Sequence, residues 1–140
     1  TAFAKRMAAQ LGVSVAAVDD PRQAVMDADF VVLATNAAEP VIETDWLAQG
    51  CHLTTLGPKF KNRHELPLDI LPRVRSCASD SPQQIATQGE NHMFFEQSLT
   101  IQHLGKYQEE QGPGDLTLFL SAGLAGTEVA LLSAAIDALA

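Results

Sequence analysis

The sequence is short of positive charge. Its 140 residues include 9 Lys and Arg but 17 Asp and Glu, which gives a formal net charge of −8. A protein that binds nucleic acid through the phosphate backbone needs a basic face. We therefore expect no nucleic-acid partner.

Long apolar runs and cysteines are also scarce. No apolar stretch approaches the roughly 20 residues of a membrane-spanning helix, and the first residues, TAFAKRMAAQLG, are amphipathic rather than a secretory signal. The two cysteines, Cys51 and Cys77, fall in predicted strands, which is typical of buried thiols in a reducing cytoplasm; a disulfide or a reactive pair is the alternative. We expect a cytoplasmic protein without a membrane partner.

Metal-ligand spacing is missing as well. The four histidines and two cysteines do not follow one another at the intervals of a metal site, and Cys51 and His52, which are adjacent, point to opposite faces of a strand. No Ser-His-Asp arrangement or nucleophile elbow is recognisable. We expect no metal.

An alternation of helices and strands is what the sequence does contain. This order predicts an α/β fold with a mainly parallel sheet, right-handed crossovers and helices on both faces. The continuously apolar run from Phe30 to Ala34 predicts a central strand that is buried on both faces. The other predicted strands are 13–18, 51–56, 74–78 and 116–120; the clearest helices are 2–11, 21–28 and 82–88 and a last one after Ser121.

A glycine-rich turn does not accompany this pattern. Nucleotide-binding α/β domains open with a strand, a glycine-rich turn and a helix, but the nine glycines here form no G-x-G-x-x-G. The sequence also begins inside a helical pattern and without Met. We expect a piece of a longer protein that lacks the first βαβ unit.

Two predicted strands end in polar or charged residues, and ligands of open parallel sheets lie at such ends. Thr35 and Asn36 follow the first and offer hydrogen-bonding side chains; a simple turn with Asn in its usual place is the alternative that local sequence favours. Gly57 follows the second and allows close approach of a ligand. Lys59, with Lys61 and Arg63 after it, is suited to a phosphate or carboxylate; a solvated loop is the alternative.

The serine at the start of the last helical pattern is a third candidate. Ser121 either exposes a helix N-terminus to an anion or serves as an ordinary serine cap. Val129, Leu132 and Ile136 mark an apolar stripe on this helix, and only Glu128 and Asp137 are charged. We expect the helix to pack against more than this chain offers.

Four segments, in order, resemble the ornithine cyclodeaminase/mu-crystallin family. They are DPRQAVMDADFVVLATN, PVIETDWLAQGCHLTTLG, HELPLDIL followed by VRSCASD, and DLTLFLSAGLAGTEVALLSAA. The resemblance implies a Rossmann-like domain that binds NAD or NADP, and a separate N-terminal dimerisation domain that is absent from residues 1–140. It also implies a homodimer that acts in amino-acid metabolism, as an oxidoreductase or lyase, on a small amino, imino or keto acid.

The resemblance also assigns roles to single residues. Ser121 stands beside the nicotinamide and Ala122 on the substrate side. The residues expected at the cofactor are Thr35, Asn36, His52, Leu53, Thr54, Thr55, Gly57, Arg63 and Ser121.

Lys59 departs from the family's pattern. Ornithine cyclodeaminases have an aspartate two residues after this glycine, where it handles the substrate amine. A lysine ammonium there repels an ammonium and suits a carboxylate or keto group, or donates a proton if burial lowers its pKa. We therefore expect Lys59 to be the catalytic residue of an enzyme whose substrate is not ornithine. The alternative is a non-catalytic, mu-crystallin-like protein that binds a nucleotide or another small ligand.

Overall fold

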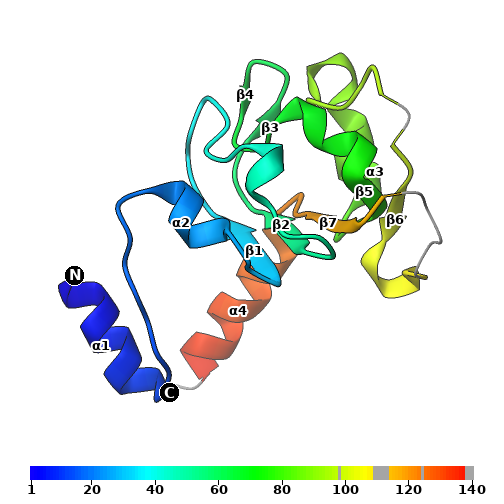
Figure 1. Ribbon diagram of the computed structural model, residues 1–140. Coiled ribbons are helices and arrows are strands. Elements are labelled where there is room, and N and C mark those ends of the chain that lie inside the picture. Colours follow the sequence, from blue (N-terminus) through cyan, green and yellow to red (C-terminus); the bar gives the residue numbers. More distant parts are fainter. Residues whose placement is uncertain (98, 109–113, 124, 138–140) are drawn as a thin grey trace.

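One sheet of five strands forms the centre of the chain, as seen in a computed structural model that describes residues 1–97, 99–108, 114–123 and 125–137. The strand order is β1-β2-β7-β5-β6, and all neighbouring strands are parallel (Figure 1). The α/β class and the mainly parallel sheet are therefore confirmed. The strands are β1 Phe30–Leu33, β2 His52–Thr55, β5 Val74–Ser79, β6 Ile101–His103 and β7 Leu116–Leu120.

Short helices and one small hairpin connect these strands. The hairpin pairs β3 (Lys59–Phe60) with β4 (Arg63–His64) in antiparallel fashion directly after β2. The α-helices are α1 Ala2–Leu11, α2 Pro21–Val25, α3 Pro82–Thr87 and α4 Ala125–Asp137. The 3₁₀ helices are η1 Thr44–Trp46, η2 Leu68–Arg73, η3 Gly89–Asn91 and η4 Leu104–Lys106.

Local sequence explains where the short helices begin. Asp20 accepts a hydrogen bond from the N–H of Arg22, and Ser81 accepts one from the N–H of Gln84. In both cases a proline occupies the first helical turn, where its missing N–H has no cost. These caps fix the entry of α2 and α3 onto the sheet.

The core lies on one face of the sheet. Leu53 and Leu118 of neighbouring strands point into it, with Ile70 of η2 and Ile85 of α3 above them. Each is less than a twentieth exposed. Buried apolar surface stabilises a fold by about 25 cal/mol per Å². The packing on this face therefore stabilises the sheet.

β1 is an edge strand, and the prediction of a central strand buried on both faces is wrong. Val31 and Leu33 point into the core, but Phe30 and Val32 on the other face are 76% and 61% exposed. Its single neighbour in the described part of the sheet is β2. An apolar run shows that both faces of a strand suit burial, but what covers them is decided by other parts of the fold.

The predicted strand at residues 13–18 is also wrong. This segment forms no strand and pairs with no strand in the described part of the chain, and Val13 and Val18 are exposed. β-branched residues favour a strand only when a neighbouring strand is present to accept its hydrogen bonds. The helix before it is as expected: α1 ends at Gly12, whose φ of 69° is the left-handed geometry of a helix stop.

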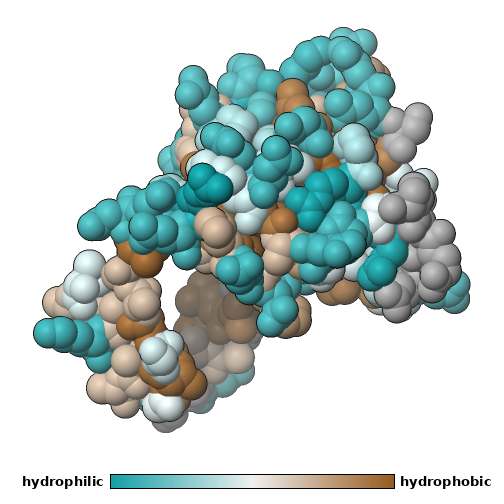
Figure 2. All heavy atoms as spheres, viewed as in Figure 1, coloured by the Kyte–Doolittle hydropathy of each residue, from teal (hydrophilic) through white to brown (hydrophobic). Residues whose placement is uncertain are grey.

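The terminal helices α1 and α4 lie at the end of the molecule away from the β3–β4 hairpin (Figure 1). Apolar surface gathers over this end (Figure 2). Phe3 and Leu11 on α1 and Val129, Leu132 and Ile136 on α4 are each more than half exposed. The helix predicted after Ser121 is thus present, and its apolar stripe has no cover among the described residues.

Candidate functional site

The carboxyl ends of four neighbouring strands meet at one edge of the sheet. Thr35 follows β1, Gly57 follows β2, Asp80 comes directly after β5 and Ser121 directly after β7. Ligands of open α/β sheets bind beyond such ends because the loops leave them exposed there. Three of these four residues were predicted from the sequence, and this edge is the candidate site.

Glu65 joins the ends of β1 and β2. Its Oε2 accepts hydrogen bonds from the N–H of Thr35 (2.8 Å) and from the Thr35 hydroxyl (2.7 Å). Its Oε1 accepts from the Thr55 hydroxyl and from the N–H of Gly57, both at 2.6 Å. Burial alone raises the pKa of Glu65, but these four donors outweigh it and hold the pKa below its usual range. The fully buried Glu65 is therefore an anion.

Gly57 is required by this carboxylate. A Cβ at position 57 would stand 2.4 Å from both Cδ and Oε2 of Glu65 and 2.5 Å from the carbonyl oxygen of Thr35. The sequence suggested that Gly57 admits a ligand. The close approach in this structure is instead between Gly57 and the two residues that hold the turn, so the glycine is explained without a ligand.

Asp80 joins the ends of β5 and β7 in a similar way. Its Oδ1 accepts from the N–H of Ala122 (2.6 Å) and its Oδ2 from the Ser121 hydroxyl (3.2 Å). Burial raises the pKa of Asp80, yet the hydrogen bonds from Ala122, Ser79 and Ser121 leave it below its usual value. The Ser121 hydroxyl thus donates to Asp80, and its two expected roles, anion binding and helix capping, stay predictions.

Lys59 turns inward between these two carboxylates. It is only 6% exposed, and its Nζ donates to the carbonyl oxygen of Gly57 (2.8 Å). Burial lowers its pKa, and the negative charges of Glu65 and Asp80 offset this only in part. Lys59 also lowers the pKa of His92, which burial has already lowered, so the imidazole stays neutral beside it.

A small hollow opens at this place. Its volume is about 170 Å³, and it lies between the turn after β2 and the segment after β7. Lys59 and Gly57 line it together with Ser121 and Ala122, and Leu56, Pro58, Phe60, Gln88 and Gly123 complete its wall. The residues predicted on the catalytic and substrate sides are thus brought together.

Asn36 and Arg63, predicted at the cofactor, also meet. The Arg63 Nη2 donates to the backbone oxygen of Asn36 (3.0 Å) and to its side-chain oxygen. Both residues are exposed, and the contact brings Arg63 of β4 to the loop after β1. A guanidinium with an amide beside it is suited to an anionic oxygen.

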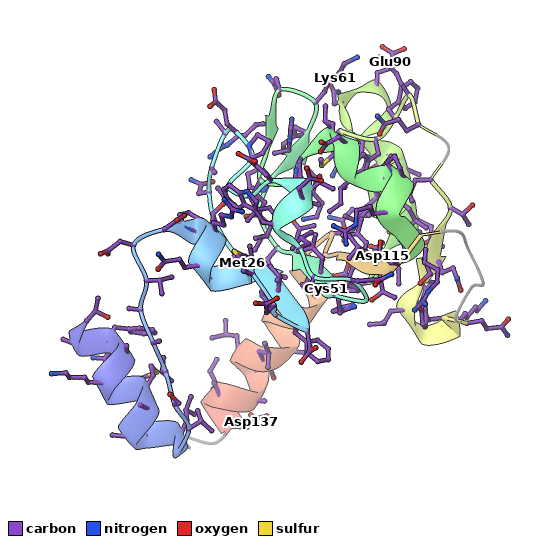
Figure 3. All side chains as sticks on the ribbon, in the orientation of Figure 1. Met26, Cys51, Lys61, Glu90, Asp115 and Asp137 are labelled. Atoms are coloured by element: carbon purple, nitrogen blue, oxygen red, sulfur yellow. The ribbon has the colours of Figure 1, made fainter. Side chains whose placement is uncertain are left out.

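Lys61, which lies between Lys59 and Arg63 in the sequence, points away from the site. It forms an exposed ion pair with Glu96 and lies beside Glu90 at the far tip of the molecule (Figure 3). A surface pair of this kind contributes little stability, about 0–1 kcal/mol. The two lysines therefore have different surroundings: Lys59 lies at the site, whereas Lys61 lies in solvent.

Alternation along β2 separates the four cofactor residues predicted there. Leu53 and Thr55 face the core with 0% exposure, and the Thr55 hydroxyl is engaged by Glu65. The cofactor contact expected of these two residues stays a prediction. His52 and Thr54 face the opposite side of the sheet. There the His52 ring bonds to the Thr117 and Thr54 hydroxyls beside a larger hollow of about 560 Å³.

Glu65 and Asp80 were missed as site residues. Glu65 is the only acidic residue between Asp45 and Asp69, and it precedes the buried Leu66. A single carboxylate between basic residues and an apolar residue was the sequence feature that could have indicated a site role for Glu65. Asp80 directly follows strand β5. The rule that ligands bind beyond the carboxyl ends of parallel strands would therefore have identified it.

Other site classes find no support in the described ranges. No three His, Cys, Asp or Glu residues there gather closely enough to hold a metal ion. Cys51 and Cys77 are both buried free thiols, and burial raises the pKa of Cys51, which makes it less reactive. No described helix has the length and apolarity needed to cross a membrane.

Comparison with known proteins identifies a family and several relatives. The sequence profile of the ornithine cyclodeaminase/mu-crystallin family matches residues 1–139. An uncharacterised cyclodeaminase from Sinorhizobium fredii is 33% identical over 98 residues, which is 70% of this chain and 30% of that protein.

Two solved structures share the fold. The probable ornithine cyclodeaminase from Bordetella pertussis has a TM-score of 0.75 at 23% identity, covering 94% of this chain and 45% of that one. The Δ1-pyrroline-2-carboxylate reductase from Thermococcus litoralis, in complex with NADH and L-proline, has a TM-score of 0.69 at 24% identity, covering 89% and 42%. The chain thus spans less than half the length of these relatives. With a profile match over nearly its whole length, this chain belongs to the ornithine cyclodeaminase/mu-crystallin family.

Proposed function

We propose that this chain is part of an NAD(P)-dependent oxidoreductase or lyase that acts on a small amino, imino or keto acid other than ornithine. The observation that carries the proposal is the inward position of Lys59, which lines the hollow with Ser121 and Ala122. The solved relative with NADH and L-proline supports the substrate class.

The residues present fit one end of a dinucleotide. A hollow of about 170 Å³ is smaller than the several hundred Å³ typical of a complete ligand site. It suits a nicotinamide ring or a small acid, while Thr35, Asn36 and Arg63 lie exposed at the neighbouring strand end. We infer that the pyrophosphate turn and the dimerisation domain belong to the rest of the protein, which acts as a homodimer.

Lys59 determines which substrates fit. The oxygens of Glu65 and Asp80 are engaged by backbone and hydroxyl donors, so the charged group at the hollow is the lysine ammonium. It binds a carboxylate or polarises a carbonyl or imine, whereas a substrate ammonium at the same place is repelled. The bound nicotinamide would supply or accept a hydride, and the side chains orient the acid beside it.

Turnover by the whole protein tests this proposal. We expect oxidation of NADH or NADPH with imino or keto acids, and no release of ammonia from ornithine. Lys59→Asp should lower kcat/KM on these acids about tenfold to a hundredfold, the value of one hydrogen bond from a charged group. Lys61→Asp is the matched control, because it makes the same charge change in solvent. Robust conversion of ornithine to proline, or equal effects of the two variants, would contradict the assignment.

A non-catalytic binding protein is the second candidate. The observation that favours it is Lys59 itself, which stands where ornithine cyclodeaminases have an aspartate. Saturable NAD(P)H binding by the whole protein, without turnover of any amino, imino or keto acid, would select this candidate.

A further inference from the structure

Glu65 occupies an unusual place among the groups of the site. It touches both turns to which the proposed function gives different tasks, Thr35 on the dinucleotide side and Gly57 on the substrate side. It has 0% exposure, so it meets no ligand itself. Any part that Glu65 plays in the reaction therefore passes through the residues that it holds.

The hydrogen bonds of Glu65 are complete. A carboxylate offers about four acceptor positions, and four donors from Thr35, Thr55 and Gly57 occupy them. Each oxygen binds a different segment: Oε2 accepts from the end of β1 and Oε1 accepts from the end of β2. A shift of either turn would break bonds to an ionised, buried group, which is costly.

The negative charge of Glu65 has a second target. Lys59 reaches back to the carbonyl oxygen of Gly57, the residue whose N–H is bound by Glu65. The charged and titratable groups that face Lys59 are Glu65 from the loop after β4, Asp80 from the end of β5, and His92 after η3. Of these, Glu65 also binds the N–H of Gly57, in the turn that leads to Lys59.

We propose that Glu65 is a positioning residue that couples the dinucleotide side of the site to its substrate side. It sets the separation of Thr35 from the Gly57–Lys59 turn, and it supplies part of the negative charge against which Lys59 stays protonated. The inference rests on the proposed function for its effect on turnover, but its effect on Lys59 is independent of any substrate.

The sign of the pH effect follows from these charges. Glu65 raises the pKa of Lys59, against the larger lowering by burial. Removing the charge of Glu65 therefore lowers this pKa further. If turnover needs the lysine ammonium, activity falls as pH rises through the pKa of Lys59, and this fall begins at lower pH when Glu65 is neutral.

Three variants of the whole protein separate charge, geometry and stability. Glu65→Gln removes the charge at nearly constant shape, and Glu65→Asp keeps the charge but shortens the side chain. Thr55→Val, the matched control, removes one of the four hydrogen bonds and leaves the charge in place. Lysine ¹³Cε NMR follows the titration of Lys59 directly, with the resonance assigned by Lys59→Arg.

We expect the Lys59 titration in Glu65→Gln to move to lower pH, and in Glu65→Asp and Thr55→Val to stay near that of the wild type. On an accepted substrate, Glu65→Gln and Glu65→Asp should lower kcat about tenfold to a hundredfold, as misplaced groups do. The basic limb of the pH profile should move only in Glu65→Gln.

Two results overturn the proposal. One is a Lys59 titration that is unchanged in folded Glu65→Gln, or shifted equally by Thr55→Val. The other is a kcat of Glu65→Asp equal to that of the wild type, a test that remains if Glu65→Gln does not fold. If the wild-type protein turns over no acid at all, the proposed function fails, while the NMR titration still decides the influence of Glu65 on Lys59.

Discussion

Gly57→Ala puts the structure of the site to a quantitative test. The added methyl group would lie 2.4 Å from Cδ and Oε2 of Glu65, whereas ordinary contacts begin near 3.4 Å. The carboxylate must therefore retreat by about 1 Å. Thr35 closes the other side, because its carbonyl oxygen is 2.5 Å from the same methyl group and belongs to the backbone.

The cost follows from the bonds that this movement breaks. Oε2 accepts the N–H and the hydroxyl of Thr35. Hydrogen bonds to a charged group contribute about 1.5–3 kcal/mol each, so losing both gives about 3–6 kcal/mol. We expect Gly57→Ala to lower the free energy of unfolding by an amount in this range, which is large for one added methyl group.

Urea unfolding, followed by fluorescence of the single tryptophan, Trp46, measures this change. Trp46 is suitable because it packs against the core. Gly105→Ala is the matched control, since the nearest atom to its added Cβ is a His103 ring atom at 3.4 Å. It should alter the free energy of unfolding by less than about 1 kcal/mol.

A double variant identifies the source of the cost. In a Glu65→Ala background the carboxylate is gone, so adding Gly57→Ala should destabilise by less than it does alone; only the contact with Thr35 remains. If Gly57→Ala matches the wild type within about 1 kcal/mol, or if the two changes simply add, the close approach of Gly57 to Glu65 is not what holds this turn.

Two further predictions concern other parts of the molecule. Asp115 accepts hydrogen bonds from Arg73, and these bonds lower the pKa of the Asp115 carboxyl group in the folded protein. The ionised Asp115 therefore contributes stability at pH values above its unfolded pKa, and this contribution is lost as the pH falls through its folded pKa. Asp115→Asn should therefore lower the free energy of unfolding by about 1 kcal/mol at neutral pH, and urea unfolding at acidic pH should show no difference from the wild type. A loss of stability that is independent of pH would contradict this prediction. The exposed stripe on α4 predicts self-association of the 140-residue chain, and replacing Val129, Leu132 and Ile136 by serine should reduce it in sedimentation experiments. A monomeric wild-type chain at high concentration would refute the second prediction.

Local patterns predicted those parts of the fold that local interactions determine. Asp20-Pro21 and Ser81-Pro82 predicted helix starts, and Gly12 predicted a helix end, because caps and left-handed stops act within a few residues. Four of the five predicted strands are present. The failures, residues 13–18 and the central place of β1, concern neighbours, which local sequence does not specify.

The candidate site was predictable to a similar extent. The rule of strand ends found Thr35 and Gly57, and the start of the last helical pattern indicated Ser121. The structure places Lys59 in one hollow with Gly57 and Ser121. Glu65 was not predicted as a site residue because its partner Thr35 lies 30 residues away in the sequence and becomes its neighbour only through the sheet. The roles of the cofactor residues stay predictions.

The contact between Gly57 and Glu65 has a consequence for how this site can evolve. Glycine at position 57, a carboxylate at position 65 and the turn at Thr35 fit one another sterically, so a change at one leaves the other two poorly matched. Replacement of Glu65 by a small residue would relieve position 57 of its requirement for glycine, and the reverse order of changes would pass through a strained intermediate. In related sequences these three positions should therefore vary as a group.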